Sequence, residues 1–145
     1  MSFHWLKMRI TEEQERRSRE AQIRERLPRA LDELHHALVD CIESYTQAFG
    51  AEAAELQLDG GRISIVVREE LDGQWQPRAT VEIATVEAVP GFQIDSGGEP
   101  LVIEVGMLPG DKLFYRDRDR DQYVSMDELT HRALDRAFFP KLRMD

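Results

Sequence analysis

The apolar positions between residues 27 and 48 recur at alternating steps of four and three residues. A period of about 3.5 residues is typical of one apolar seam along an α-helix. Further apolar residues at positions 23, 39, 42 and 49 widen this seam enough to cover a sheet. The pattern predicts a packing helix over residues 27–49, ended by Gly50 and built on Leu27, Leu31, Leu34, Leu38, Cys41, Tyr45 and Ala48.

Residues 11–26 offer almost nothing to bury before Ile23, and their charges are ordered. Thr11 to Gln14 matches a capping box, which predicts a helix start at Thr11. Pro28 lacks the N–H that would bond the carbonyl of Arg24, so we expect a kink or a restart there. We predict a projecting charged helical arm over residues 11–26, stabilised by five Glu–Arg pairs four residues apart: Glu12–Arg16, Glu13–Arg17, Glu15–Arg19, Glu20–Arg24 and Glu25–Arg29.

From residue 54 to residue 116 the apolar positions alternate with polar ones at a period of two, which predicts strands. Turn signals such as Asp59-Gly60-Gly61 and Asp72-Gly73 separate the runs, and residues 94–100 have the composition of a loop. Short connections make neighbouring strands antiparallel. The expected strands of this sheet of four to five strands lie within residues 55–58, 63–68, 80–86, 101–105 and 113–115.

A second capping box, Ser125 to Glu128, predicts a C-terminal helix over residues 126–139 that Pro140 ends. The sheet has one apolar face, which the packing helix and this last helix would cover. The predicted fold is therefore a two-layer α+β domain spanning residues 1–145. It combines a long N-terminal helix kinked near Pro28, an antiparallel sheet and a C-terminal helix.

Charge is unevenly distributed along the chain, whose net charge is −9. Residues 1–30 carry eight basic and five acidic side chains, a net +3, whereas the remainder carries eleven basic and 23 acidic ones, a net −12. An acidic body argues against nucleic acid as a partner. The absence of a long apolar run and of a signal-peptide pattern argues against a membrane partner and favours the cytoplasm. The single cysteine, Cys41, excludes an internal disulfide.

The segment from Asp117 to Glu128 resembles the calcium-binding loop of an EF-hand. Oxygen ligands fall at loop positions 1, 3, 5, 7 and 12, which suits a hard cation. Gln122 stands where the loop usually has glycine, and the preceding residues predict a turn and a strand instead of a helix. As an alternative to a calcium loop, a solvated turn followed by a helix cap explains the same residues. The candidate calcium ligands are Asp117, Asp119, Asp121, the Tyr123 carbonyl and Glu128.

The remaining reactive side chains indicate no catalytic site. His35 and His36 are adjacent on the helix, about 100° apart, and lack ligand spacing. His131 pairs with an acid one turn away, which is a surface contact. Cys41 lies on the apolar seam, where a buried inert thiol is expected. Neither a nucleophile elbow nor a phosphate-binding glycine motif is present, so we predict no catalytic residue and no bound cofactor.

These features favour a small non-catalytic binding or assembly module in the cytoplasm that acts as a homodimer. The helical seam is longer than one short-stranded sheet can cover, and the basic arm is opposite in charge to the acidic body. Self-association through the N-terminal helix is therefore expected, together with a possible protein partner. A secretion-chaperone-like or immunity-type role fits this class by analogy of fold. The alternatives are a calcium-binding module and an enzyme of unrecognised type.

Overall fold

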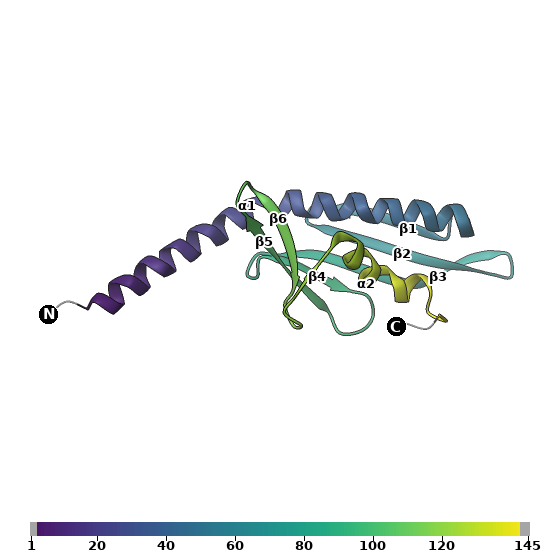
Figure 1. The fold of residues 1–145 in the computed structure, drawn as a ribbon. Helices are drawn as coiled ribbons and strands as arrows, with labels where there is room; N and C mark the ends of the chain where they lie inside the picture. The colour runs from purple at the N-terminus through teal and green to yellow at the C-terminus, as the bar shows by residue number, and fades with distance from the viewer. Residues whose placement is uncertain (1–2, 143–145) are drawn as a thin grey trace.

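The computed structural model describes residues 3–142, which form two helices and one sheet. The α+β class, the long N-terminal helix, the antiparallel sheet and the C-terminal helix are all confirmed (Figure 1). The elements in chain order are α1 (His4–Phe49), β1 (Ala54–Asp59), β2 (Arg62–Leu71), β3 (Gln74–Val86), β4 (Gly91–Asp95), β5 (Leu101–Leu108), β6 (Lys112–Asp117), β7 (Gln122–Val124) and α2 (Met126–Phe138).

The sheet has seven strands, so the expected count of four to five was too low. The two strands that were not predicted are β4 and β7, which are five and three residues long. Each is too short to show a period of its own. Both strands are defined by their pairing with neighbouring strands: Ile94 of β4 lies opposite Ile83 of β3, and Gln122 of β7 lies opposite Asp117 of β6. The loop expected over residues 94–100 was wrong at its start, because Ile94 and Asp95 belong to β4.

Neighbouring strands pair antiparallel in strict chain order from β1 to β7. Residues opposite each other in such pairs share a face of the sheet. Ile63, Ile83 and Ile94 therefore form one row across β2, β3 and β4, and all three are buried. Their row belongs to a core cluster that also contains the buried apolar residues of both helices. One face of the sheet is thus the floor of the core.

The C-terminal part of α1 and the whole of α2 cover this floor. In Figure 1, α1 runs beside β1, while α2 lies in front of the sheet near β3. Leu34 and Leu38 of α1 and Leu129 of α2 are completely buried. The phenol of Tyr115 on β6 donates a hydrogen bond of 2.7 Å to Glu33, which fixes α1 to the far half of the sheet. The buried leucines of α1 thus perform the packing role predicted for the seam.

Two glycines let strands and side chains approach closely. A Cβ atom on Gly91 would lie 1.9 Å from the carbonyl oxygen of Ile103 on β5, so no larger residue fits there without moving a strand. A Cβ atom on Gly106 would lie 2.0 Å from the ring of Phe114, its partner across β5 and β6. The ring covers the glycine, and both positions hold the middle of the sheet together.

Helix α1 begins at His4, seven residues before the predicted start. Thr11 does not cap the helix, because its hydroxyl donates to the carbonyl of Lys7 at 3.1 Å inside the helix. Pro28 lies within α1, so the chain bends without breaking, and Figure 1 shows the N-terminal part leaving the body at an angle. No residue from 3 to 22 is buried, and burial begins at Ile23. We call residues 3–22 the arm and residues 3–10 its tip.

The charge pairs of the arm form a different pattern from the one expected. Of the five predicted pairs, Glu13–Arg17 and Glu20–Arg24 are present. Arg16 instead bridges Glu13 at 2.7 Å and Glu20 at 2.5 Å. The guanidinium groups of Arg16 and Arg17 lower the pKa of the Glu13 carboxyl to about 2. One arginine reaches acids on both sides of it in the helix, so the spacing of four residues is only one of the available choices.

Candidate functional site

The Asp117–Glu128 segment is a β-hairpin followed by a helix cap. Asp117 ends β6, and its side chain is only 1% exposed. One carboxylate oxygen of Asp117 accepts hydrogen bonds from the backbone N–H groups of Asp119 at 3.1 Å and Arg120 at 3.3 Å. The other oxygen lies 2.5 Å from Nη1 of Arg132 on α2. This aspartate therefore ties the β6–β7 turn to α2 through a buried ion pair.

The other candidate calcium ligands have separate surroundings. Asp121 pairs with Arg116 on β6, and the side chain of Tyr123 is 73% exposed. The backbone N–H of Glu128 donates to the hydroxyl of Ser125 at 3.1 Å, so the second predicted cap is present. Within residues 3–142, these acids do not bring three ligand atoms within 4.8 Å of one another. Calcium binding by Asp117, Asp119, Asp121, Tyr123 and Glu128 stays a prediction.

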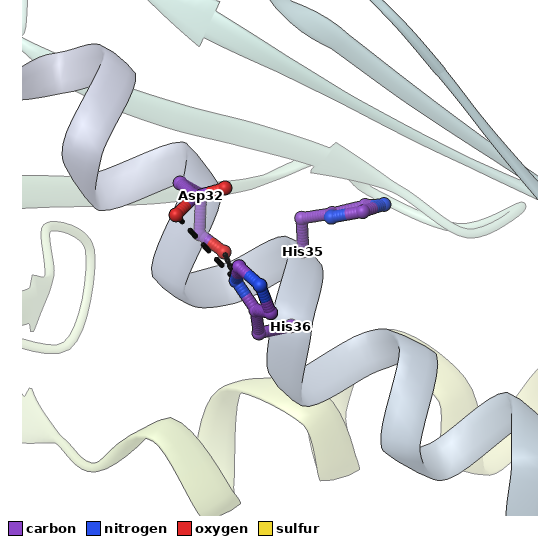
Figure 2. Close-up of side chains that lie close together, drawn as sticks. All are labelled: Asp32, His35 and His36. Carbon is purple, nitrogen blue, oxygen red and sulfur yellow. Dashed lines mark hydrogen bonds and ion pairs between the residues drawn. The ribbon is translucent and has the colours of Figure 1, made fainter.

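One other group of possible metal ligands lies on α1. The ligand atoms of Asp32, His35 and His36 lie within 4.8 Å of one another. The sequence predicted no metal-ligand spacing for the two adjacent histidines, but their ligand atoms lie close together in the structure. Figure 2 shows that the His36 ring turns toward Asp32, whereas the His35 ring points away from both. Nδ1 of His36 donates to the backbone carbonyl of Asp32 at 2.8 Å, so that nitrogen has no lone pair for a metal.

An apolar hollow lies between the C-terminal half of α1 and α2, and we call it the interhelical groove. Its volume is about 580 Å³. Aromatic rings close one end of it: Tyr45 stacks on Phe138 with ring centres 4.0 Å apart, and Phe49 lies 4.9 Å from Tyr45. The groove is lined by Asp40, Cys41, Ser44, Tyr45, Ala48, Phe49, Asp127, Thr130, His131, Leu134, Asp135, Phe138 and Phe139.

Acidic side chains line both rims of the interhelical groove. Asp40 lies on the α1 side, and Asp127 and Asp135 lie on the α2 side. His131 is 3.6 Å from Asp135, the helical neighbour contact expected from the sequence. Partial burial raises the pKa of the Cys41 thiol, which a hydrogen bond with Thr130 opposes. The groove therefore combines an apolar floor with negative edges and a neutral thiol.

Arg78 on β3 fixes the aromatic end of the groove. Its Nη2 donates to the backbone carbonyls of Ala137 at 2.6 Å and Phe138 at 3.0 Å, where α2 ends. The phenol of Tyr45 donates to the same Phe138 carbonyl at 3.4 Å. A cation is favourable at the C-terminal end of a helix, where the last carbonyls lack helical partners. Arg78 and Tyr45 thus hold Phe138 in its stacked position.

The tip of the arm is the second unusual surface, because large apolar side chains cover it. Every residue from 3 to 12 is exposed. The sequence contains a signal for this surface, because Phe3, Leu6 and Ile10 recur at steps of three and four. The exposed fractions of the tip side chains are 55% for Phe3, 66% for Trp5, 40% for Leu6, 52% for Met8 and 47% for Ile10.

Comparisons with known proteins found no similar family, protein or structure. No protein-family model matches the chain, and neither a curated protein nor a solved structure matches it. Within the part of the chain that the structure describes, no helix combines the length and the apolar character needed to cross a membrane. The tip and the interhelical groove are the two surfaces of the chain that point to a function.

Proposed function

We propose that this chain is a small, non-catalytic binding and assembly module that acts as a homodimer through its N-terminal helix. One observation carries the proposal: five large apolar side chains are exposed within the eight residues of the tip. Single exposed apolar residues are ordinary, but a cluster of them marks an interaction surface. The cluster lies on an arm without any buried residue, so none of residues 3–142 covers it.

The energy available at the tip is of the right size for association. Full burial of one such side chain contributes about 1.5–3 kcal/mol. With roughly half of each side chain exposed, five of them contribute about 4–7 kcal/mol per arm. A symmetric dimer buries two arms, and its gain of about 8–14 kcal/mol is comparable with the ~4–15 kcal/mol cost of association. The tip can therefore support a dimer if an apolar surface receives it.

A catalytic role is less well supported by the same surfaces. Catalysis needs polar groups that converge on one reacting atom. In the interhelical groove the acids lie on opposite rims, and the floor between them is apolar. The neutral thiol of Cys41 also lacks the lowered pKa that activates a nucleophile. The unpaired thiol suits the reducing cytoplasm in which we place the module.

Light scattering on the full chain tests the proposal with a matched pair of variants. Ile10→Glu places a charge on the Phe3, Leu6 and Ile10 stripe, while Leu71→Glu places the same charge at an exposed residue of β2, outside the tip. We expect the wild type and Leu71→Glu to be dimers at micromolar concentration and Ile10→Glu to be a monomer with an unchanged far-UV spectrum. A monomeric wild type would refute the proposal.

A further inference from the structure

We propose that the interhelical groove of a second copy receives the tip of the arm. The proposal deepens the homodimer suggested above and rests on it, because it names the surface that each arm occupies. The groove is an apolar hollow that the described residues leave open, and the tip is a dense group of exposed apolar side chains. Both surfaces are apolar, so each can bury the other.

A tip cannot occupy the groove of its own chain. The tip and one wall of the groove lie on the same continuous helix, α1. Ile10 and Cys41 are separated by about 45 Å at 1.5 Å per residue. The bend near Pro28 would have to fold the helix back on itself to close that distance, and α1 continues through Pro28 as one helix. The occupant must therefore come from another copy.

The charges of the tip match the rims of the groove. At about 100° per residue, Lys7 and Arg9 lie about 80° to either side of the line between Leu6 and Ile10. The tip thus presents an apolar stripe with a base on each flank. Arg9 pairs with Glu12 at 2.9 Å, and both side chains of this pair are exposed, so a groove acid can approach the same guanidinium. The groove presents an apolar floor with Asp40 on one rim and Asp127 and Asp135 on the other. A helix lying along the groove would place one base near each acidic rim, which favours this orientation.

Two-fold symmetry completes the arrangement. If one tip enters the groove of the partner, the same contact repeated by the partner uses both tips and both grooves, and the assembly closes as a dimer. Since the tip and the groove wall both belong to α1, the two long helices then run side by side in opposite directions. A single protomer would leave an exposed tip and an empty groove, which explains why neither is satisfied within one chain.

Cysteine crosslinking tests this contact directly, because Cys41 lines the groove and is the only cysteine of the chain. Ile10→Cys adds a second thiol on the stripe, and Leu71→Cys adds one at an exposed residue of β2, outside the tip. Both full-length variants are treated with a short bifunctional maleimide at mildly alkaline pH. We expect Ile10→Cys to form a covalent dimer in which mass spectrometry finds position 10 joined to position 41, and Leu71→Cys to form little.

Several outcomes would overturn the proposal, and they differ in what else they refute. Links only between the two position-10 thiols would mean that the arms pair with each other, so the groove proposal would fail while the homodimer stood. A wild type that stays monomeric would refute both. As a second measurement, Phe49→Ala in the groove should weaken the dimer about tenfold or more. Leu71→Ala, at an exposed residue away from the groove, should not; equal effects would contradict the proposal.

Discussion

Replacing Arg132 with methionine is expected to destabilise the fold strongly, although no ligand or partner is involved. Arg132 is the cation that faces the Asp117 carboxylate, and the distance between them is 2.5 Å. Asp117 is 1% exposed, so water cannot replace the lost partner. Two backbone N–H groups would still donate to the carboxylate. The variant thus keeps the hydrogen bonds of a buried negative charge but removes the charge that balances it.

The size of the effect follows from this asymmetry. Removing one partner of a buried ion pair costs about 3–5 kcal/mol. An unfolding entropy of about 2.1 cal/mol/K per residue amounts to ~0.3 kcal/mol/K for the whole chain, so the midpoint should fall by about 10–16 °C. Asp117→Asn should cost less, about 1.5–3 kcal/mol. It leaves Arg132, which is 22% exposed and has Glu128 as a second partner at 3.9 Å.

Urea unfolding of the wild type and both variants, followed by far-UV circular dichroism, measures these free energies. Arg16→Met, which removes an exposed arginine from ion pairs on the arm, is the matched control, and we expect it to change the free energy of unfolding by less than about 1 kcal/mol. An Arg132→Met variant as stable as the wild type, or an Asp117→Asn variant less stable than Arg132→Met, would contradict the stabilising role of Arg132 beside the buried carboxylate.

Three further outcomes are expected. Gly91→Ala should destabilise the sheet by more than about 1 kcal/mol or prevent folding, measured by thermal melting, because its Cβ would lie 1.9 Å from the Ile103 carbonyl. Burial and the Glu33 hydrogen bond raise the pKa of Tyr115, so the folded protein holds a proton that the unfolded chain releases above pH ~10. The free energy of unfolding should therefore fall as pH rises above ~10, and Tyr115→Phe should reduce that fall. If the Asp117–Glu128 segment binds calcium, a free calcium concentration about 100 times Kd should add about 2.7 kcal/mol in a melt against chelator; an unmoved midpoint refutes calcium binding.

Local patterns predicted the elements that long periodic segments specify. The seam of α1 is buried through Leu27, Leu31, Leu34 and Leu38, because a helix long enough to show its period has few alternative arrangements. The two capping boxes show the limit of such signals. Ser125 caps α2, whereas Thr11 lies inside α1, because residues 4–10 continue the helix and nothing before Thr11 stops it.

The surfaces that carry the functional proposal depend on tertiary contacts, which no single stretch of sequence contains. The interhelical groove exists because α2, about 80 residues after Tyr45, packs beside α1. The Asp117–Arg132 pair likewise joins a strand end to a helix. The local motif that suggested Asp117 as a metal ligand does not reveal Arg132 as its ion-pair partner. The apolar stripe of the tip is present in the sequence, but the helix was predicted to start at Thr11, so residues 3–10 were not interpreted as helical.

Sedimentation equilibrium of the full chain at micromolar concentrations tests the central claim most directly. The homodimer predicts a mass of two chains that dissociates on dilution, and Ile10→Glu predicts a mass of one chain under the same conditions. A wild type that sediments as one chain throughout this range would contradict the assignment of the exposed tip to self-association.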